Sequence, residues 1–451
     1  MTWLTYECRL LLRSRLSMVA LLLLLVLTSV AVWSGLHEIE RQQQTIARLA
    51  PLHEQDVAVV AAQYAEGGDA GSPAYYTFYN TWDAPSDAAF LALGLRDAAP
   101  YVLRVRALGL QAQLYEGEVF NPELALAGKF DFAFVLIYLA PLFVIALLHD
   151  LVSGERQSGR LRLLLSVPDG GRMWRRRVVL RYVLLSACLL IPMLVGAAVA
   201  GTAVLTVGIA LVVAASYLAF WVGLALLVAN RGWRSVANAT ALMGAWVILT
   251  LVLPALANVA LVRAIPVTQG VDLMLSQRQA VHGAWEVPRE ETMQRFLANH
   301  PEWKDTAPLP AGFHWKWYFA FHQLGDESVA EQARAYRAGL LARQEWSDRL
   351  GGVLPGVGVQ AALHRAAHTD LLAQLAYQDR IADFHRQIRE FYYPYMFNDR
   401  PFSTADFPHR PTFESPKHEV QWSGTNVLVL LLMCWLFAGW GWWRIGRLRS
   451  D

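Results

Sequence analysis

Six long apolar runs constrain the fold of this chain more than any other feature of its sequence. They cover residues 16–36, 130–148, 178–199, 203–229, 236–263 and 427–443. A helix needs about 20 mostly apolar residues to cross a hydrocarbon core of roughly 30 Å, and each run meets or approaches that length. We therefore predict an all-α polytopic membrane protein with six transmembrane helices.

The composition agrees with this class. Charged residues make up 17% of the 451 residues, whereas soluble domains contain about 25%. The three cysteines, Cys8, Cys188 and Cys434, lie at the N-terminus or inside apolar runs. Their placement excludes a disulfide framework in the polar regions and a metal site of the Cys-x-x-Cys type.

The distribution of Lys and Arg predicts that both termini are cytoplasmic. In that orientation the inside segments hold 15 Lys and Arg in 59 residues, and the outside segments 37–129 and 265–425 hold 22 in 254. Such an excess is the positive-inside pattern, which predicts a multi-pass membrane protein with this orientation. The inside segments include a tail, 444–451, and residues 1–15. These first residues, with Arg9 and Arg13 among leucines, suit either an interfacial helix or a plain basic flank.

Both outside segments are predicted to be mainly helical domains. A helical pattern continues from the first apolar run through residues 37–66, which favours a long helix projecting from the membrane over a cleaved signal peptide. In the second segment, apolar residues recur at three- and four-residue steps in DLMLSQRQAVHG, ESVAEQARAYRAGLLARQEWSDRLGG and AALHRAAHTDLLAQLAYQDRIADFHRQIREFYYP. We expect three helices there.

Known catalytic motifs are missing from the sequence. It contains no Walker loop, no Gly-x-Ser-x-Gly and no His-Glu-x-x-His. His364, His368 and Asp370 come nearest to a metal site, but two histidines on one helix face are a weak signal, and we expect no metal or cofactor in this chain. Asp131 opens the second apolar run and is better explained as a helix-start acid than as a membrane-buried functional group.

Residues 149–177 form an arginine-rich segment between two apolar runs, with seven arginines and three acidic residues. Helical spacing puts Leu161, Leu164 and Leu165 near one face of this segment. Arginines alone would suit a positive-inside loop that lies on anionic membrane lipid. The acid-base pair Glu155-Arg156 is not needed for that role and suggests docking to a cytoplasmic protein.

The same segment carries a family resemblance. SGERQSGRLRLLLSVP resembles the ER-x-x-GTL-x-x-LL-x-x-P segment of ABC-2 type transporter permeases, with Gly159-Arg160-Leu161 in place of Gly-Thr-Leu. GLRDAAPYVLRVRAL and NPELALAGKFDFAFVLIYLAPLFVIALLHDLVSGER are similar to the branch that carries a DUF3526 region. AHTDLLAQLAYQDRIADFHRQIREFYYP resembles that branch's second external domain, with His368 where glycine is usual.

The resemblance implies a permease subunit of an ATP-driven transporter, an exporter in the usual case, and not an enzyme. ATP and Mg²⁺ would bind a separate ATP-binding subunit. That subunit would dock on Glu155, Arg156, Gly159 and Leu161, with Arg9 and Arg13 as secondary contacts. Gly159 would permit a close backbone approach. A second permease, identical or paralogous, would complete the transporter, and nucleic acid is not among the expected partners.

Two other classes of function are open at this level. One is a membrane enzyme that uses the region of His364, His368 and Asp370. The other is a scaffold or sensor whose outside domains bind a periplasmic or envelope protein. The sequence selects neither a substrate nor a direction of transport.

Overall fold

The computed structural model describes residues 3–64, 68–115, 130–166, 170–267, 270–415 and 424–447. Two parts of the family-like motifs lie outside these residues. They are NPELALAGK, within residues 116–129, and VPD, at residues 167–169.

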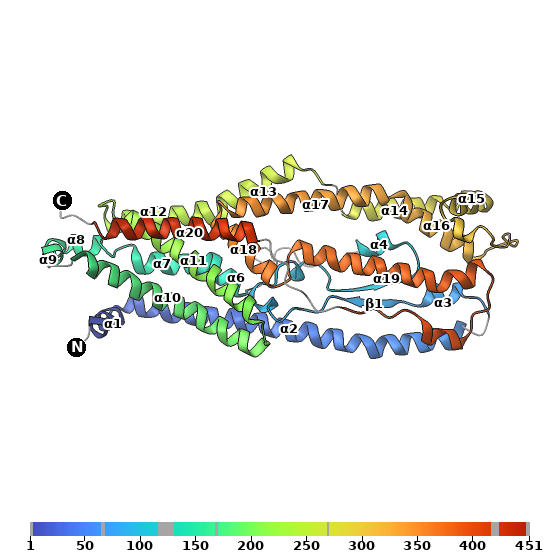
Figure 1. Ribbon diagram of the computed structural model, residues 1–451, viewed down its shortest axis with the longest axis horizontal. Coiled ribbons are helices and arrows are strands. Elements are labelled where there is room, and N and C mark those ends of the chain that lie inside the picture. The colour runs from blue at the N-terminus through green and yellow to red at the C-terminus, as the bar shows by residue number, and fades with distance from the viewer. Residues whose placement is uncertain are drawn as a thin grey trace.

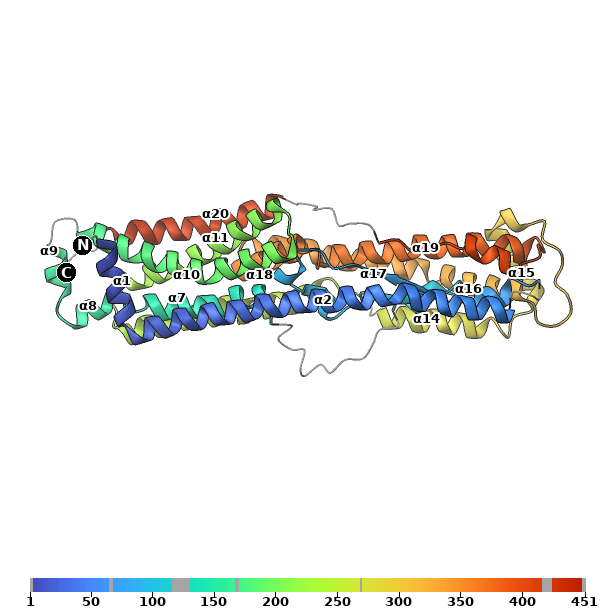
Figure 2. The same ribbon diagram turned by 90° about the horizontal axis from the view of Figure 1, so that it is seen from below.

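A single helix, α2 (Arg15–Tyr64), runs along most of an elongated molecule (Figure 1). Its 50 residues span about 75 Å at 1.5 Å per residue. Both chain ends lie at one end of the molecule, the proximal end, and α15 and α16 lie at the other, the distal end (Figure 2). The helix predicted after residue 37 therefore continues the first apolar run, and α1 (Trp3–Arg13) precedes it as a separate helix.

The proximal half, which we call the bundle, contains six helices that are long and apolar enough to cross a membrane, as predicted. They are the first half of α2; α6 (Phe132–Phe134), η4 (Val135–Leu139) and α7 (Ala140–Leu148); α10 (Gly170–Ala200); α11 (Val204–Ala229); α12 (Ser235–Val247), η5 (Ile248–Val252) and α13 (Leu253–Ala264); and α20 (Gly424–Ile445). Two further short helices, α8 (Ser153–Gln157) and α9 (Leu161–Ser166), lie at the proximal end (Figure 1).

The π turn η4 shows how the bundle accommodates a proline. Pro141 has no N–H, so the carbonyl of Ile137 loses its usual helical partner. The hydroxyl of Tyr217 on α11 donates to that carbonyl at 3.0 Å, and the indole Nε1 of Trp246 on α12 donates to the next carbonyl, that of Tyr138, at 3.1 Å. The carbonyls freed by the break in α6–α7 thus accept hydrogen bonds from neighbouring helices, as buried backbone groups generally do.

The distal half, which we call the distal domain, joins both outside segments around one hydrophobic core. The sequence predicts two domains there, but Val57 and Val105 from the first segment share this core with Phe296 and Tyr392 from the second. The distal domain comprises the second half of α2, with α3 (Gly71–Tyr76), α4 (Leu110–Leu114), α14 (Gly270–Gly283), α15 (Arg289–Asn299), α16 (Trp315–Ser328), α17 (Ala330–Gly351) and α19 (Leu371–Phe397). The short turns η3 (Gly94–Asp97), η6 (Pro301–Trp303) and η7 (Thr404–His409) complete it, whereas η2 (Ala89–Leu91) packs in the hydrophobic core of the bundle.

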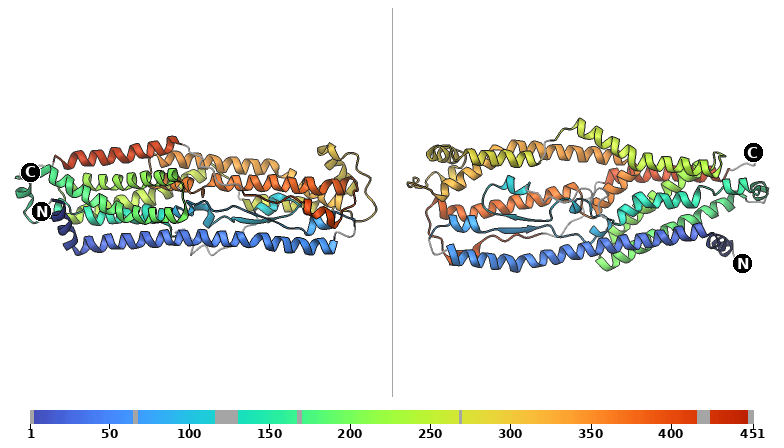
Figure 3. Two further views of the ribbon diagram at one scale, coloured as in Figure 1. Left: turned by 60° about the horizontal axis from the view of Figure 1, so that its bottom comes forward. Right: turned by 180° about the vertical axis from the view of Figure 1, so that it is seen from behind.

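A β-hairpin is the one departure from an all-α fold within the described residues. Strands β1 (Tyr79–Trp82) and β2 (Val102–Val105) pair antiparallel, with Tyr79 opposite Val105. The hairpin lies between α2 and α19 (Figure 3). The sequence pattern does not reveal these strands, because strands this short give little periodicity and are stabilised by the residues that they pack against.

The third predicted helix of the second outside segment is broken in the structure. It forms α18 (Pro355–Ala366) and α19, separated by a turn at His368, whose φ is 53°. Glycine adopts this left-handed conformation most readily, and glycine is the residue usual at this position in the family that the sequence resembles. The break lets α18 pack on α11 and α20 of the bundle while α19 extends into the distal domain.

Candidate functional site

The arginine-rich segment folds into α8 and α9 at the proximal end, next to both chain ends (Figure 1). Gly159 separates the two helices and has a φ of 71°. A Cβ built on Gly159 would meet no atom within 4 Å. Within the chain, the left-handed φ is the feature of Gly159 that favours glycine.

Glu155 joins α8 to its neighbours through charge-assisted hydrogen bonds. Its carboxylate accepts from Nε of Arg160 at 2.9 Å and from Nη1 of Arg177, on α10, at 3.3 Å. Nε of Arg177 also donates to Glu7 of α1 at 3.1 Å. The side chain of Glu155 is 20% exposed. Glu155 therefore positions α8 against α10 and α1.

Arg156 also faces inward. A Cβ built on Gly232, in the turn between α11 and α12, would lie 3.4 Å from Nη1 of Arg156. That Nη1 is buried and has no hydrogen-bond partner among the described residues. Close by, the hydroxyls of Ser153 and Ser235 lie 2.9 Å apart. The start of α8 thus rests on the start of α12.

The outer face of α8 and α9 consists of residues that the sequence did not single out. Leu161 is 5% exposed and packs in the core of the bundle, with Leu164 and Leu165 beside it, as the helical spacing predicted. Leu163 is 70% exposed. Gln157, Arg160 and Arg162 are exposed as well. We call Gln157, Arg160, Arg162 and Leu163 the docking face. The exposure of Leu163 follows from the same helical periodicity, because a leucine two residues after a buried one lies on another face of the helix.

The two secondary residues of the predicted site lie on α1. Arg9 and Arg13 are exposed, whereas Glu7 on the same helix is buried against Arg177. The ion pair of Glu7 places α1 next to α10 and the start of α8. The structure therefore brings all six predicted docking residues to one end of the molecule, with different exposure.

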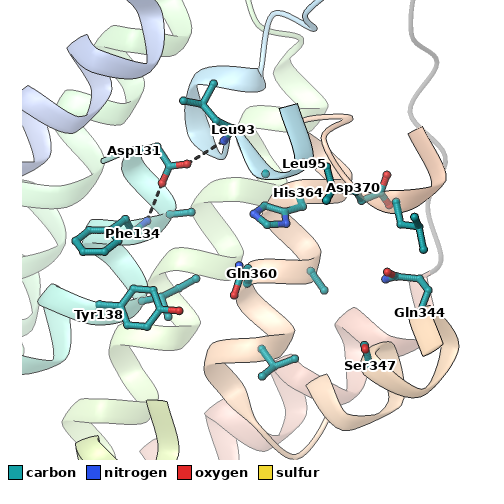
Figure 4. A pocket seen from close by; sticks show the side chains of 16 residues that line it. Leu93, Leu95, Asp131, Phe134, Tyr138, Gln344, Ser347, Gln360, His364 and Asp370 are labelled. Atoms are coloured by element: carbon teal, nitrogen blue, oxygen red, sulfur yellow. Dashed lines mark hydrogen bonds between the residues drawn. The ribbon is translucent and has the colours of Figure 1, made fainter. Parts of the chain in front are cut away.

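A cavity of about 540 Å³ lies between the bundle and the distal domain (Figure 4). Its walls come from α6–η4 on one side and from α17 and α18 on the other. Asp131 caps α6 by accepting from the N–H of Phe134 at 2.8 Å, and its second oxygen accepts from the N–H of Leu93 at 2.9 Å. The prediction of a helix-start acid is confirmed. The polar groups Tyr138, Gln344 and Gln360 also line the cavity.

His364 and Asp370 line the same cavity but are not arranged as metal ligands. Asp370 caps α19 through the N–H of Ala373 at 3.1 Å and lies 3.5 Å from Nε of Arg365. His368 lies in the turn before α19. Burial lowers the pKa of His364 to about 4, against the opposing effect of Asp370. Among the described residues no three His, Cys, Asp or Glu side chains gather in a way that could hold a metal ion.

A second cavity of about 540 Å³ lies inside the distal domain. It is lined by polar groups of α15, α16 and α19, among them His300, Glu327 and Arg389. Nε2 of His300 lies 2.6 Å from Oε1 of Glu327, and hydrogen bonding to Glu327 raises the pKa of His300.

Comparison with known proteins identifies one region of the chain. Residues 272–415 match a domain of unknown function, DUF3526. No curated protein and no solved structure matches the chain. The matched region covers most of the second outside segment, in agreement with the resemblance of that segment to the DUF3526 branch of permeases.

Proposed function

We propose that the chain is the permease subunit of an ABC-2 type ATP-driven transporter, an exporter of the bacterial inner membrane. The observation that carries the proposal is the position of the docking face. It lies at the proximal end with both chain ends, opposite the distal domain (Figure 2). Its outward side chains are cationic, neutral polar or apolar, and inward side chains of α8 bond to α10 and α12.

The inward contacts give a route for mechanical coupling. Glu155 connects α8 to α10 through Arg177, and Arg177 connects to α1 through Glu7. Ser153 connects α8 to α12 through Ser235. A partner that displaces the docking face would therefore move several bundle helices together, because charge-assisted bonds are directional and resist separation.

The helix α2 extends this route to the distal domain. It packs along α10 inside the bundle and then contributes Val57 to the distal core. Movement at the proximal end would tilt α2. This tilt would change the shape of the cavity between the two halves, because the walls of the cavity belong to different elements. ATP binding and hydrolysis belong to the separate ATP-binding subunit in this proposal, and a second permease faces this one.

Purification of the tagged chain from its native host in mild detergent tests the proposal. We expect an ATP-binding subunit in stoichiometric amount. Leu163→Asp should release this subunit, because burial of a carboxylate in the apolar contact made by Leu163 costs free energy. Leu52→Asp is a matched control, since Leu52 is a 53% exposed leucine on the distal part of α2. Absence of any ATP-binding subunit from the unaltered chain would refute the permease assignment.

The polar cavity of the distal domain favours one second candidate, a sensor that binds a ligand or an envelope partner outside the membrane. Among its lining residues, His300 pairs with Glu327 and Arg389 pairs with Asp326. Stable capture of an external partner without an ATP-binding subunit would support the sensor in place of the permease.

A further inference from the structure

Two connected cavities form a groove on the surface of the bundle between α10, α11 and α20. Their volumes are about 310 and 360 Å³, and they share Val179 and Trp442. The first is lined by Arg172, Arg175 and Arg176 near the start of α10. The second is lined by apolar and small residues farther along the same helices. The groove is therefore cationic at its proximal end and apolar along its length.

Glycine packing between α11 and α20 explains why the groove exists. A Cβ built on Gly223 would lie 2.5 Å from the carbonyl oxygen of Phe437, and one on Gly441 would lie 2.5 Å from that of Gly223. The two backbones touch at Gly223, which lines the groove and adds no side chain to it. Gly439 lines the groove, and a Cβ there would meet no atom within 4 Å.

Three side chains with hydrogen-bonding groups, Tyr182, Trp435 and Trp442, line the apolar part, and two of them bond to neighbouring helices. The hydroxyl of Tyr182 donates to the carbonyl of Ala215 at 2.9 Å. The indole Nε1 of Trp435 donates to the hydroxyl of Ser216 at 3.1 Å. What remains for an occupant along this part is apolar surface.

The proximal end of the groove is suited to an anion. The guanidinium of Arg175 lies 5.4 Å from the centre of the Trp442 ring, and its Nε is buried without a hydrogen-bond partner among the described residues. Arg172 and Arg176 are exposed beside it. No acidic side chain lines either cavity within the described part of the chain. Guanidinium groups bind phosphate oxygens in a directional, bidentate manner.

We propose that this groove binds one anionic phospholipid, with its phosphate at Arg172, Arg175 and Arg176 and an acyl chain along Gly439. The inference rests on the membrane placement in the proposed function. From Arg172 to Tyr182 the helix rises about 15 Å at 1.5 Å per residue, which equals one leaflet of a hydrocarbon core of roughly 30 Å. A free phosphate would contact only the arginines and leave the apolar part of the groove empty. A helix of a second copy would fill the apolar part and leave the arginines without an anion.

Native mass spectrometry of the full chain in detergent with phosphatidylglycerol tests this site. We expect one retained phosphatidylglycerol per chain and weaker retention of phosphatidylcholine. Gly439→Leu should abolish retention by filling the groove. Gly244→Leu is the matched control, because Gly244 on α12 also has open space at its Cβ and lines neither cavity. Replacing the three arginines with glutamine should weaken binding about a hundredfold, since each basic residue near an anionic surface contributes about fivefold.

Several results would overturn the inference. They are equal retention of phosphatidylcholine, unchanged retention in Gly439→Leu, and displacement of the lipid by excess inorganic phosphate. Oxidation of Gly439→Cys to a covalent dimer in membranes, beyond that of the unaltered chain, would instead identify the groove as an interface between copies. The ATP-binding subunit is measured in the same samples. If the lipid is lost while the ATP-binding subunit is retained, only the proposed lipid site is refuted. If the subunit is lost while the lipid is retained, only the permease assignment is refuted.

Discussion

Arg177 of α10 donates a hydrogen bond to Glu155 of α8 across 3.3 Å, and both side chains are largely buried, at 15% and 20% exposure. Glu155, which the sequence suggested would face a partner, instead holds the docking face in place. Two kinds of residue therefore share the arginine-rich segment: positioning residues that face the bundle and the docking face that points away from it.

The Glu155–Arg177 pair should behave as a coupled unit. Glu155→Gln and Arg177→Met are each expected to lower the free energy of unfolding and to impair transport. The double variant should lose about 1 kcal/mol less than the sum of the single losses, the usual size of such a coupling. Thermal unfolding of the unaltered chain, the two single variants and the double variant measures this coupling energy. Strict additivity would show that the two side chains do not interact.

Leucines 161 and 163 should separate folding from docking. Leu161→Ala removes a side chain packed in the bundle core and should lower the free energy of unfolding by about 2–5 kcal/mol. Leu163→Ala should leave the unfolding temperature unchanged and weaken association with the ATP-binding subunit. Thermal unfolding and co-purification distinguish the two effects. Equal destabilisation by both changes would contradict the outward position of Leu163.

Asp83 should be essential to the distal domain. Its oxygens each lie 2.6 Å from a guanidinium nitrogen, one of Arg96 and one of Arg380, and the Asp83 and Arg96 side chains are at most 7% exposed. Asp83→Ala leaves two cations without their acid and should cost about 3–5 kcal/mol of unfolding free energy. Asp56→Ala is the control. Asp56 is 62% exposed and 3.6 Å from Arg104, so its loss should cost less than about 1 kcal/mol.

Acidification should destabilise the distal domain. Burial lowers the pKa of His322 to about 3, with Arg389 and Arg106 acting in the same direction. The unfolded histidine titrates near 6.5, so between that pH and about 3 the unfolded state binds more protons and stability falls as pH falls. The slope is at most about 1.4 kcal/mol per pH unit for one histidine.

His300 acts in the opposite sense, because its raised pKa gives stability that is present below pH 6.5 and is lost as pH rises through the folded value. Thermal unfolding from pH 7.5 to pH 5 measures the balance. His322→Gln should flatten the decline on the acid side, and His300→Gln should steepen it. An identical pH profile for His322→Gln and the unaltered chain would show that the pKa of His322 is the same in the folded and unfolded states.

Close packing of α11 on α20 should tolerate no side chain at Gly223. Gly223→Val should lower the free energy of unfolding by about 1–3 kcal/mol or more, because its Cβ would meet the backbone of α20. Gly244→Val, with open space at the same atom, should change it by less than about 1 kcal/mol. Thermal unfolding of both variants checks the contrast, and similar losses would argue against backbone contact at Gly223.

Local pattern alone determined the helical part of this fold. Run length and apolarity placed six helices correctly, and the spacing in residues 149–177 put Leu161, Leu164 and Leu165 on an inner face. Asp131 was recognisable as a helix-start acid. These features depend on residues within a few turns of one another, and helical periodicity records such neighbours directly.

Tertiary structure decided the rest, because it depends on residues far apart in the chain. Asp83 meets Arg380, and Glu155 turns inward because Arg177 and Glu7 meet there. One distal core joins two segments that the sequence presents as separate domains. The groove beside Gly439 exists because two distant glycines bring α11 and α20 into backbone contact. Sequence periodicity does not reveal contacts between distant residues, because burial and charge pairing are decided only when the helices pack.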